Sequence, residues 1–128
     1  MPTRGREEVD EIEGLHESPV AGTEERDGAV VVRLAGELDL YNAHVVRTEL
    51  IDAAERGPER LIVELSGVTF IDSTGLGVLI EARTRLANRS AFLLVGPGLE
   101  TRRALEISGL VRHFAVHETL DEALSASV

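Results

Sequence analysis

The feature that most constrains the fold is an alternation of short apolar runs with longer segments of helical period. Three runs are rich in aliphatic and β-branched residues and are bounded by turn residues, which predicts buried strands at Ala29–Ala35, Arg60–Leu65 and Ala91–Val95. Between them, apolar residues recur at helical spacing over about Leu40–Arg56 and Ser73–Asn88. Strands that alternate with helices of this length predict an α/β fold with parallel crossovers.

Glycine and proline mark where these elements stop. Gly57-Pro58 ends the first helix, because proline lacks the amide hydrogen that would continue the helical ladder and disfavours helix in the preceding residue. Further elements are predicted as a loop at Ser66–Asp72, a helix at Leu99–Ser108, a brief strand at His113–His117 and a last helix at Glu118–Ala126. We predict one domain, with a mixed, mostly parallel sheet of four to five strands and about four helices packed on it.

The first 28 residues differ from the rest. They hold 9 of the 23 acidic residues and 3 of the 13 arginines, a local charge of −6, and lack a sustained helical or strand period. We predict an acidic flexible arm at 1–28 and the folded domain at 29–128. A strand at Leu15–Ala21 is weakly indicated, and Pro19 within it would allow only an edge position.

The charge composition excludes several classes of function. The net charge is −10, every cation is an arginine, and cysteine is absent. Phosphate backbones and anionic membranes are therefore poor partners, and lysine chemistry, disulfides and thiolate metal sites are ruled out. No apolar run is long enough to span a bilayer, so we expect a cytoplasmic protein. We also expect that it carries no cofactor.

One segment, Phe70–Gly77, carries recognisable chemistry. Its sequence, FIDSTGLG, lies where a loop turns into a helix, so the Ser73 hydroxyl would face free amides and the positive end of the helix dipole. A phosphoryl group would be tolerated there. The alternative is an ordinary helix cap, made by Ser73 or by Asp72.

The motif resembles the phosphorylation segment of anti-sigma factor antagonists, members of the STAS domain family. A second match, Leu34–Asp39 (LAGELD), is similar to that family's strand-end signature, and Ser108–Leu110 resembles its "SGL" motif. The resemblance covers Ala29–Val128. It implies a STAS-like domain without catalysis of its own.

The resemblance also implies a partner-switching role in transcription regulation during stress. The unphosphorylated protein would bind an anti-sigma factor that is also a serine kinase, with ATP bound by the kinase. Phosphorylation of Ser73, or as second choice Thr74, would end the binding, and a PP2C-like phosphatase would restore it. The partner-binding residues expected on this basis are Glu37, Asp39, Asp72, Ser73, Thr74, Gly75, Leu76 and Gly77.

Other constellations are weaker. His113 and His117 have a spacing that suits zinc on a helix, but the local pattern is that of a strand, so we expect no metal site. Arg102-Arg103 and Arg112 form a small basic spot that we interpret as a solvated helix face. Two rival functions remain. One is a STAS scaffold that is never phosphorylated and forms part of a larger signalling or transport assembly. The other is a small acidic hydrolase or nucleotide-handling protein.

Overall fold

The computed structural model describes residues 18–128, which form five strands and four helices with two short 3₁₀ turns. The strands are β1 (Val20–Arg26), β2 (Ala29–Leu38), β3 (Arg60–Ile71), β4 (Phe92–Val95) and β5 (Ala115–His117). The helices are α2 (Ala43–Glu55), α3 (Ser73–Thr84), α4 (Leu99–Ile107) and α5 (Leu120–Ser125), and the 3₁₀ turns are η1 (Arg89–Ala91) and η2 (Leu110–Arg112).

The strands form one mixed sheet in the order β1-β2-β3-β4-β5. β1 runs antiparallel to β2, and the pairs β2–β3, β3–β4 and β4–β5 are parallel. The predicted fold class, a mostly parallel sheet of four to five strands with about four helices, is confirmed. Parallel strands need crossovers, and α2, α3 and α4 supply them.

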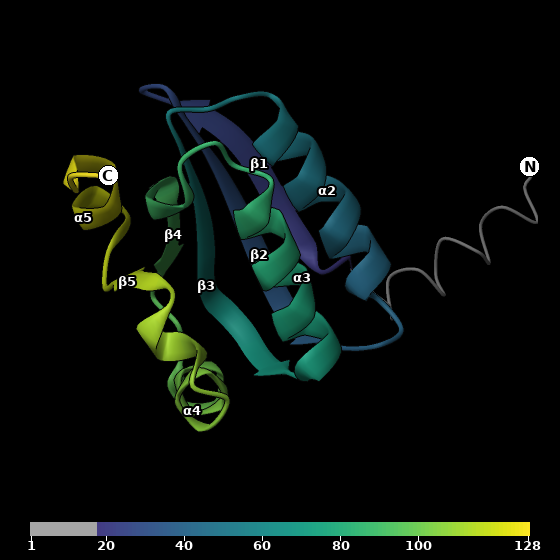
Figure 1. The fold of residues 1–128 in the computed structure, drawn as a ribbon. Helices are drawn as coiled ribbons and strands as arrows, with labels where there is room; N and C mark the ends of the chain where they lie inside the picture. The colour runs from purple at the N-terminus through teal and green to yellow at the C-terminus, as the bar shows by residue number, and fades with distance from the viewer. Residues whose placement is uncertain (1–17) are drawn as a thin grey trace, which may run out of the picture.

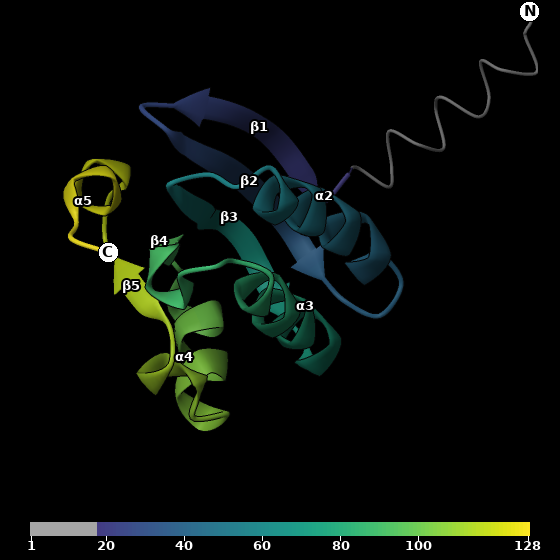
Figure 2. The same cartoon turned by 45° about the horizontal axis from the view of Figure 1, so that its top comes forward.

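Helices cover the sheet unequally. α2 and α3 lie side by side on one face in both ribbon views, and α5 lies beyond the β4–β5 side (Figures 1 and 2). The main core lies under α2 and α3 and includes Leu50, Val63 and Leu79. A smaller cluster on the other face joins Ile62 and Leu93 of the sheet to α5. The near-continuous apolar character of β2 and β4 reflects burial on both faces.

The predicted boundary at residue 28 is corrected by the structure. Val20–Arg26, placed in the flexible arm by the sequence pattern, pairs with β2 as an edge strand; Pro19 immediately precedes it. Asp27 and Gly28 both have positive φ, at 54° and 82°, as the tight turn between two hairpin strands requires. The Asp-Gly pair is the sequence signal that would have revealed this hairpin. Residues 15–17 of the predicted strand, and the rest of the arm before them, lie outside the described residues.

Several element ends also differ from prediction. α2 begins at Ala43, because residues 39–42 form a hydrogen-bonded turn of their own. β3 continues to Ile71 through the segment predicted as a loop. α3 ends at Thr84, four residues early, and residues 89–91 form the turn η1 before β4. The extension of β3 matters most, because it carries the strand directly to Asp72.

Candidate functional site

Two parallel strands end together at the site. In the register of β2 and β3, Glu37 lies opposite Phe70 and Leu38 opposite Ile71. The amide of Asp72 donates a hydrogen bond to the Leu38 carbonyl at 3.1 Å. The segments that follow β2 and β3 therefore meet at one edge of the sheet, which brings Glu37 close to the serine motif.

Asp72 joins the two segments and begins α3. Its backbone is extended, and its Oδ1 accepts a hydrogen bond from the Gly75 amide at 3.0 Å, which caps the helix. Its Oδ2 accepts from the Leu40 amide at 3.2 Å, in the loop after β2. Both oxygens of the Asp72 carboxylate are thus engaged with backbone donors.

The hydroxyl groups at the start of α3 are left without a capping role. Ser73 is exposed at the first helical position, and Thr74, next to it, is half-buried. Within residues 18–128, the Ser73 hydroxyl makes no hydrogen bond, whereas Thr48 and Thr84, which are also helical, bond to backbone carbonyls. The capping alternative is therefore met by Asp72, and Ser73 lies exposed beside it.

The two glycines of the motif have different roles. A Cβ on Gly75 would lie 2.8 Å from Cγ1 of Ile71 and 3.2 Å from the Leu38 carbonyl oxygen, so the first turn of α3 packs against the strand ends only with glycine. A Cβ on Gly77 would meet nothing within 4 Å. Both glycines were expected among the partner-binding residues, but internal packing is enough to account for Gly75. Gly77 remains on the open surface.

Leu76 also departs from the prediction. It was expected to contact the partner, but its side chain is 8% exposed and belongs to the main core. Successive residues of a helix point in directions about 100° apart, so Leu76 points inward although it lies between Gly75 and Gly77. Leu76 therefore positions α3 on the sheet.

The two acidic residues at the end of β2, Glu37 within the strand and Asp39 just after it, have different roles. The Oδ1 of Asp39 accepts hydrogen bonds from the amides of Tyr41 and Asn42, at 3.0 and 3.2 Å, and the Asn42 side chain bonds back to the Asp39 amide and the Glu37 carbonyl. Asp39 thus organises its own loop, and it does not cap α2 directly. The Glu37 side chain is exposed and makes no hydrogen bond within residues 18–128.

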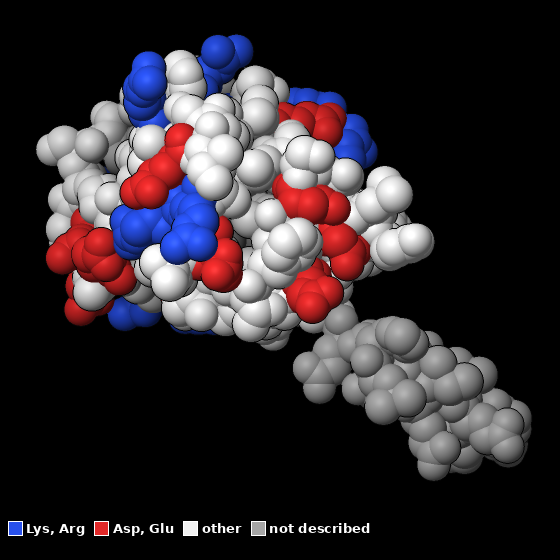
Figure 3. Space-filling view, turned by 90° about the horizontal axis from the view of Figure 1, so that it is seen from below, with Lys and Arg blue, Asp and Glu red and all other residues white. Residues whose placement is uncertain are grey.

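Three exposed apolar residues at this edge were missed by sequence reasoning. Leu40 and Tyr41, 66% and 85% exposed, lie in the loop after β2, and Phe70 is 48% exposed at the end of β3. Leu40 and Tyr41 were predicted to lie inside a helix, and Phe70 inside a loop. Figure 3 looks at this end of the domain and shows uncharged surface between acidic groups on its right-hand side. The edge therefore combines apolar and acidic surface beside Ser73.

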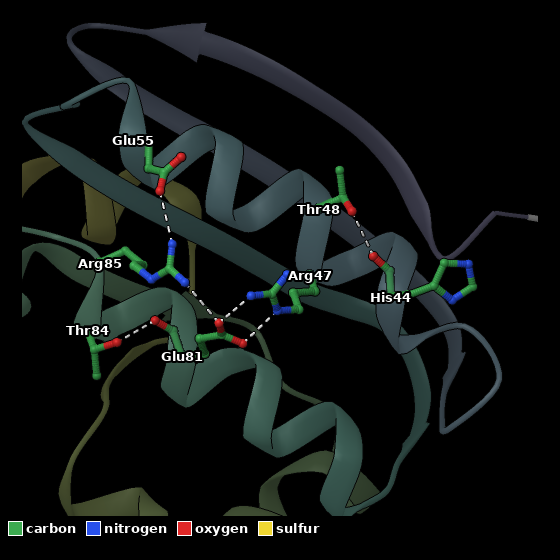
Figure 4. A network of polar contacts seen from close by, with 7 residues as sticks. All are labelled: His44, Arg47, Thr48, Glu55, Glu81, Thr84 and Arg85. Carbon is green, nitrogen blue, oxygen red and sulfur yellow. Dashed lines mark hydrogen bonds and ion pairs between the residues drawn. The ribbon is translucent and has the colours of Figure 1, made fainter.

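An ion-pair network holds α3 against α2 (Figure 4). Arg47 of α2 donates two hydrogen bonds to the Glu81 carboxylate, at 2.8 and 2.6 Å, and Arg85 bridges Glu81 and Glu55. The hydrogen bond from Arg47 holds the pKa of the Glu81 carboxyl below its ordinary value. The network joins the two helices whose amino ends border the site.

Within residues 18–128, no three histidine, cysteine or acidic side chains are grouped so that they could hold a metal ion. None of the helices in this part of the chain is long and apolar enough to cross a membrane.

Comparison with known proteins agrees with this geometry. The profile of the family described as "STAS domain" matches residues 21–123. The chain belongs to the STAS domain family. The anti-sigma-F factor antagonist RsfB of Mycobacterium tuberculosis is 30% identical over 101 residues, which cover 79% of this chain and 83% of that relative. The chain is thus similar in both sequence and extent to a small antagonist protein.

Solved structures of STAS proteins show the same arrangement. An anti-sigma factor antagonist from Mycobacterium paratuberculosis superimposes with a TM-score of 0.76 at 33% identity, covering 81% of this chain and 89% of that one. The antagonist SpoIIAA, 26% identical, has been solved unphosphorylated and phosphorylated, with TM-scores of 0.68 and 0.62. These comparisons cover 80% of this chain and 91% and 95% of SpoIIAA, respectively. The fold is therefore that of STAS antagonists.

Proposed function

We propose that this STAS protein is an anti-sigma factor antagonist that binds an anti-sigma factor and is released from it when Ser73 is phosphorylated. The observation that carries the proposal is the accessible Ser73 hydroxyl at the start of α3, where Asp72 already caps the helix. Modification of this hydroxyl removes no internal hydrogen bond within residues 18–128. The fold can therefore persist while the surface changes.

The surroundings of Ser73 explain why a phosphate would act as a switch. Phosphorylation adds about −1.5 to −2 charges and strongly hydrated oxygens. Uncharged surface is provided nearby by Gly77 on α3 and by Leu40 and Tyr41 in the loop joined to Asp72. A partner packed on this surface would have to desolvate the phosphate, which is costly. Asp72 and Glu37 add like charge at the same edge.

The site also indicates how an unmodified partner complex would be held. Exposed apolar side chains at an otherwise acidic edge suit a partner surface with apolar groups and flanking arginine or lysine residues. In this proposal the partner is an anti-sigma factor that acts as a serine kinase, binds ATP itself, and is opposed by a PP2C-like phosphatase. No cofactor is assigned to the STAS protein.

The test combines modification with binding. Intact mass is measured before and after incubation with candidate anti-sigma kinases and ATP, for the wild type and for Ser73→Ala, Thr74→Ala and Ser90→Ala. We expect one phosphate on every variant except Ser73→Ala; Ser90 is an exposed serine on η1 and serves as the matched control. Ser73→Glu is expected to weaken binding to the kinase by about tenfold or more without a change in melting temperature.

Two results would redirect the proposal. If kinases that modify other antagonists leave all four proteins unmodified but still bind them, the protein is an unphosphorylated STAS interaction module. If Ser73→Ala is modified as fully as the wild type, and Thr74→Ala is not, Thr74 is the acceptor.

A further inference from the structure

Basic side chains line one pocket on a part of the domain away from Ser73. The pocket has a volume of about 440 Å³ and lies where η1, β4, η2, β5 and residues 126 and 127 meet. Three arginines and two histidines line it: Arg83, Arg89, Arg112, His113 and His117. No aspartate or glutamate is among its lining residues. A local excess of cations is unusual here, because the chain as a whole has a net charge of −10.

These arginines are not used in ion pairs within the described part of the chain. There, five other arginines pair with carboxylates, at positions 33, 47, 56, 85 and 102. Arg60 is occupied by two backbone carbonyls. Arg83, Arg89 and Arg112 have no carboxylate partner among residues 18–128, although acidic residues outnumber arginines there. Their clustering therefore leaves several guanidinium donors to share a common ligand.

The walls of the pocket are held in place by the fold. Phe92 and Phe114 line it and pack together with ring centroids 5.7 Å apart. Arg60 donates hydrogen bonds to the carbonyls of Ala123 and Ala126, at 2.6 and 2.8 Å, which fastens the segment that follows α5. On the η1 side, Asn88 accepts a hydrogen bond from the Ser90 amide. The cations are thus presented around a formed hollow.

The pocket suits a small ligand. Its volume is within the range of about 300–1,000 Å³ that is typical of small-molecule sites. Guanidinium groups match the oxygens of phosphate and carboxylate in geometry as well as charge. A second hollow of about 180 Å³ shares Arg83, His113 and Phe114 with the first and adds the apolar side chains of Ile80 and Leu110. An anion with a compact apolar group would fill both.

We propose that this pocket binds a small phosphorylated anion, either phosphate itself or a phosphate ester with a short apolar group. Arg89 and Arg112 would contact the phosphate, with Arg83 between the phosphate and the apolar hollow. The pocket is separate from Ser73. Arg83 is ten residues further along α3, a distance of about 15 Å along the helix axis at 1.5 Å per residue.

The experiment is an amide NMR titration of the full chain in phosphate-free buffer at constant ionic strength. The probes are inorganic phosphate and phenyl phosphate. We expect saturable shifts of amides in residues 89–93 and 112–117. If the ligand is an ester, phenyl phosphate binds more tightly and also shifts Ile80 and Leu110; if it is free phosphate, the two anions bind alike.

Substitutions separate a built site from general attraction. Arg89→Gln and Arg112→Gln should each weaken binding by about tenfold, since a charge-assisted hydrogen bond is worth a factor of that order. Arg103→Gln is the matched control, because Arg103 is an exposed arginine of α4 without a carboxylate partner in residues 18–128 and lies outside the pocket. Binding should be unchanged in this variant.

The proposal is overturned if neither anion produces saturable shifts, or if Arg103→Gln weakens binding as much as Arg112→Gln does. The side chains of Arg89 and Arg112 are exposed and make no hydrogen bond within residues 18–128, so loss of the fold is not expected in either variant. Circular dichroism melting of each variant checks this. The result is independent of whether Ser73 is phosphorylated.

Discussion

Replacement of Gly75 by alanine tests the packing at the start of α3. The added Cβ would lie 2.8 Å from Cγ1 of Ile71, a buried β-branched side chain, and 3.2 Å from the backbone oxygen of Leu38. Neither neighbour can move cheaply, because Ile71 ends β3 and Leu38 accepts the hydrogen bond from Asp72. Overpacking of this kind costs about 1–3 kcal/mol. Alanine regains up to about 1 kcal/mol in helix propensity, so we expect a net loss of about 1–2 kcal/mol in the free energy of unfolding.

Gly77→Ala is the matched control in the same helix. Its Cβ would have no neighbour within 4 Å, so only the propensity term remains and the domain should gain up to about 1 kcal/mol. Urea denaturation followed by circular dichroism measures both free energies, and equal m-values would show that the unfolding reaction is the same. Thermal melting should separate the two variants by several degrees, at about 3–6 °C per kcal/mol.

A Gly75→Ala protein as stable as Gly77→Ala, or more stable, would refute this reasoning. It would mean that the strand ends relax around the new methyl group. Gly75 would then have to be explained by the approach of a partner.

Three further predictions concern the surroundings of the site. Asp72→Ala removes the cap of α3 and the bond to the Leu40 amide; it should lower the free energy of unfolding by about 1–2 kcal/mol in urea titrations, and an unchanged value would show that the cap is replaced. The pKa of Glu81 is lowered in the folded protein, so the unfolded chain binds more protons. The stabilisation is present above the ordinary value of 4.5 and is lost as pH falls through the folded pKa. In Glu81→Gln, the free energy of unfolding should therefore fall less steeply at acid pH than in the wild type. An identical fall in the two proteins would contradict the role of Arg47. Tyr41→Ala should leave the melting temperature within experimental error but weaken binding to the anti-sigma factor, because the side chain is 85% exposed and contributes little to the core.

The serine motif shows how far local sequence can lead. Its position at the start of a helix was predictable, since Asp72 is a good cap and Phe70-Ile71 continue an apolar segment. Which residue caps the helix was left open by the pattern, because both Asp72 and Ser73 favour the position. The extended backbone of Asp72 and its bond from the Gly75 amide decide the question. The accessible serine is a consequence of that choice.

The same motif shows where local sequence fails. Gly75 and Gly77 are equivalent in the sequence pattern, yet one is packed against strand ends and the other faces open space. Phe70 is apolar but half-exposed, because β3 continues past residue 65 and its side chains alternate between faces. Each difference depends on neighbours that are distant in sequence.

The sequence by itself determined the elements whose cause is local: the apolar runs of β2, β3 and β4, the helical periods between them, and the turns made by glycine and proline. For β1, the Asp27-Gly28 turn is a local signal, but VAGTEER itself has little apolar periodicity and becomes a strand only by pairing with β2. Tertiary structure alone brought Arg83, Arg89 and Arg112, from three separate segments, to one pocket. Burial and charge clustering are properties of contacts across the chain, and a linear pattern records only the local part of them.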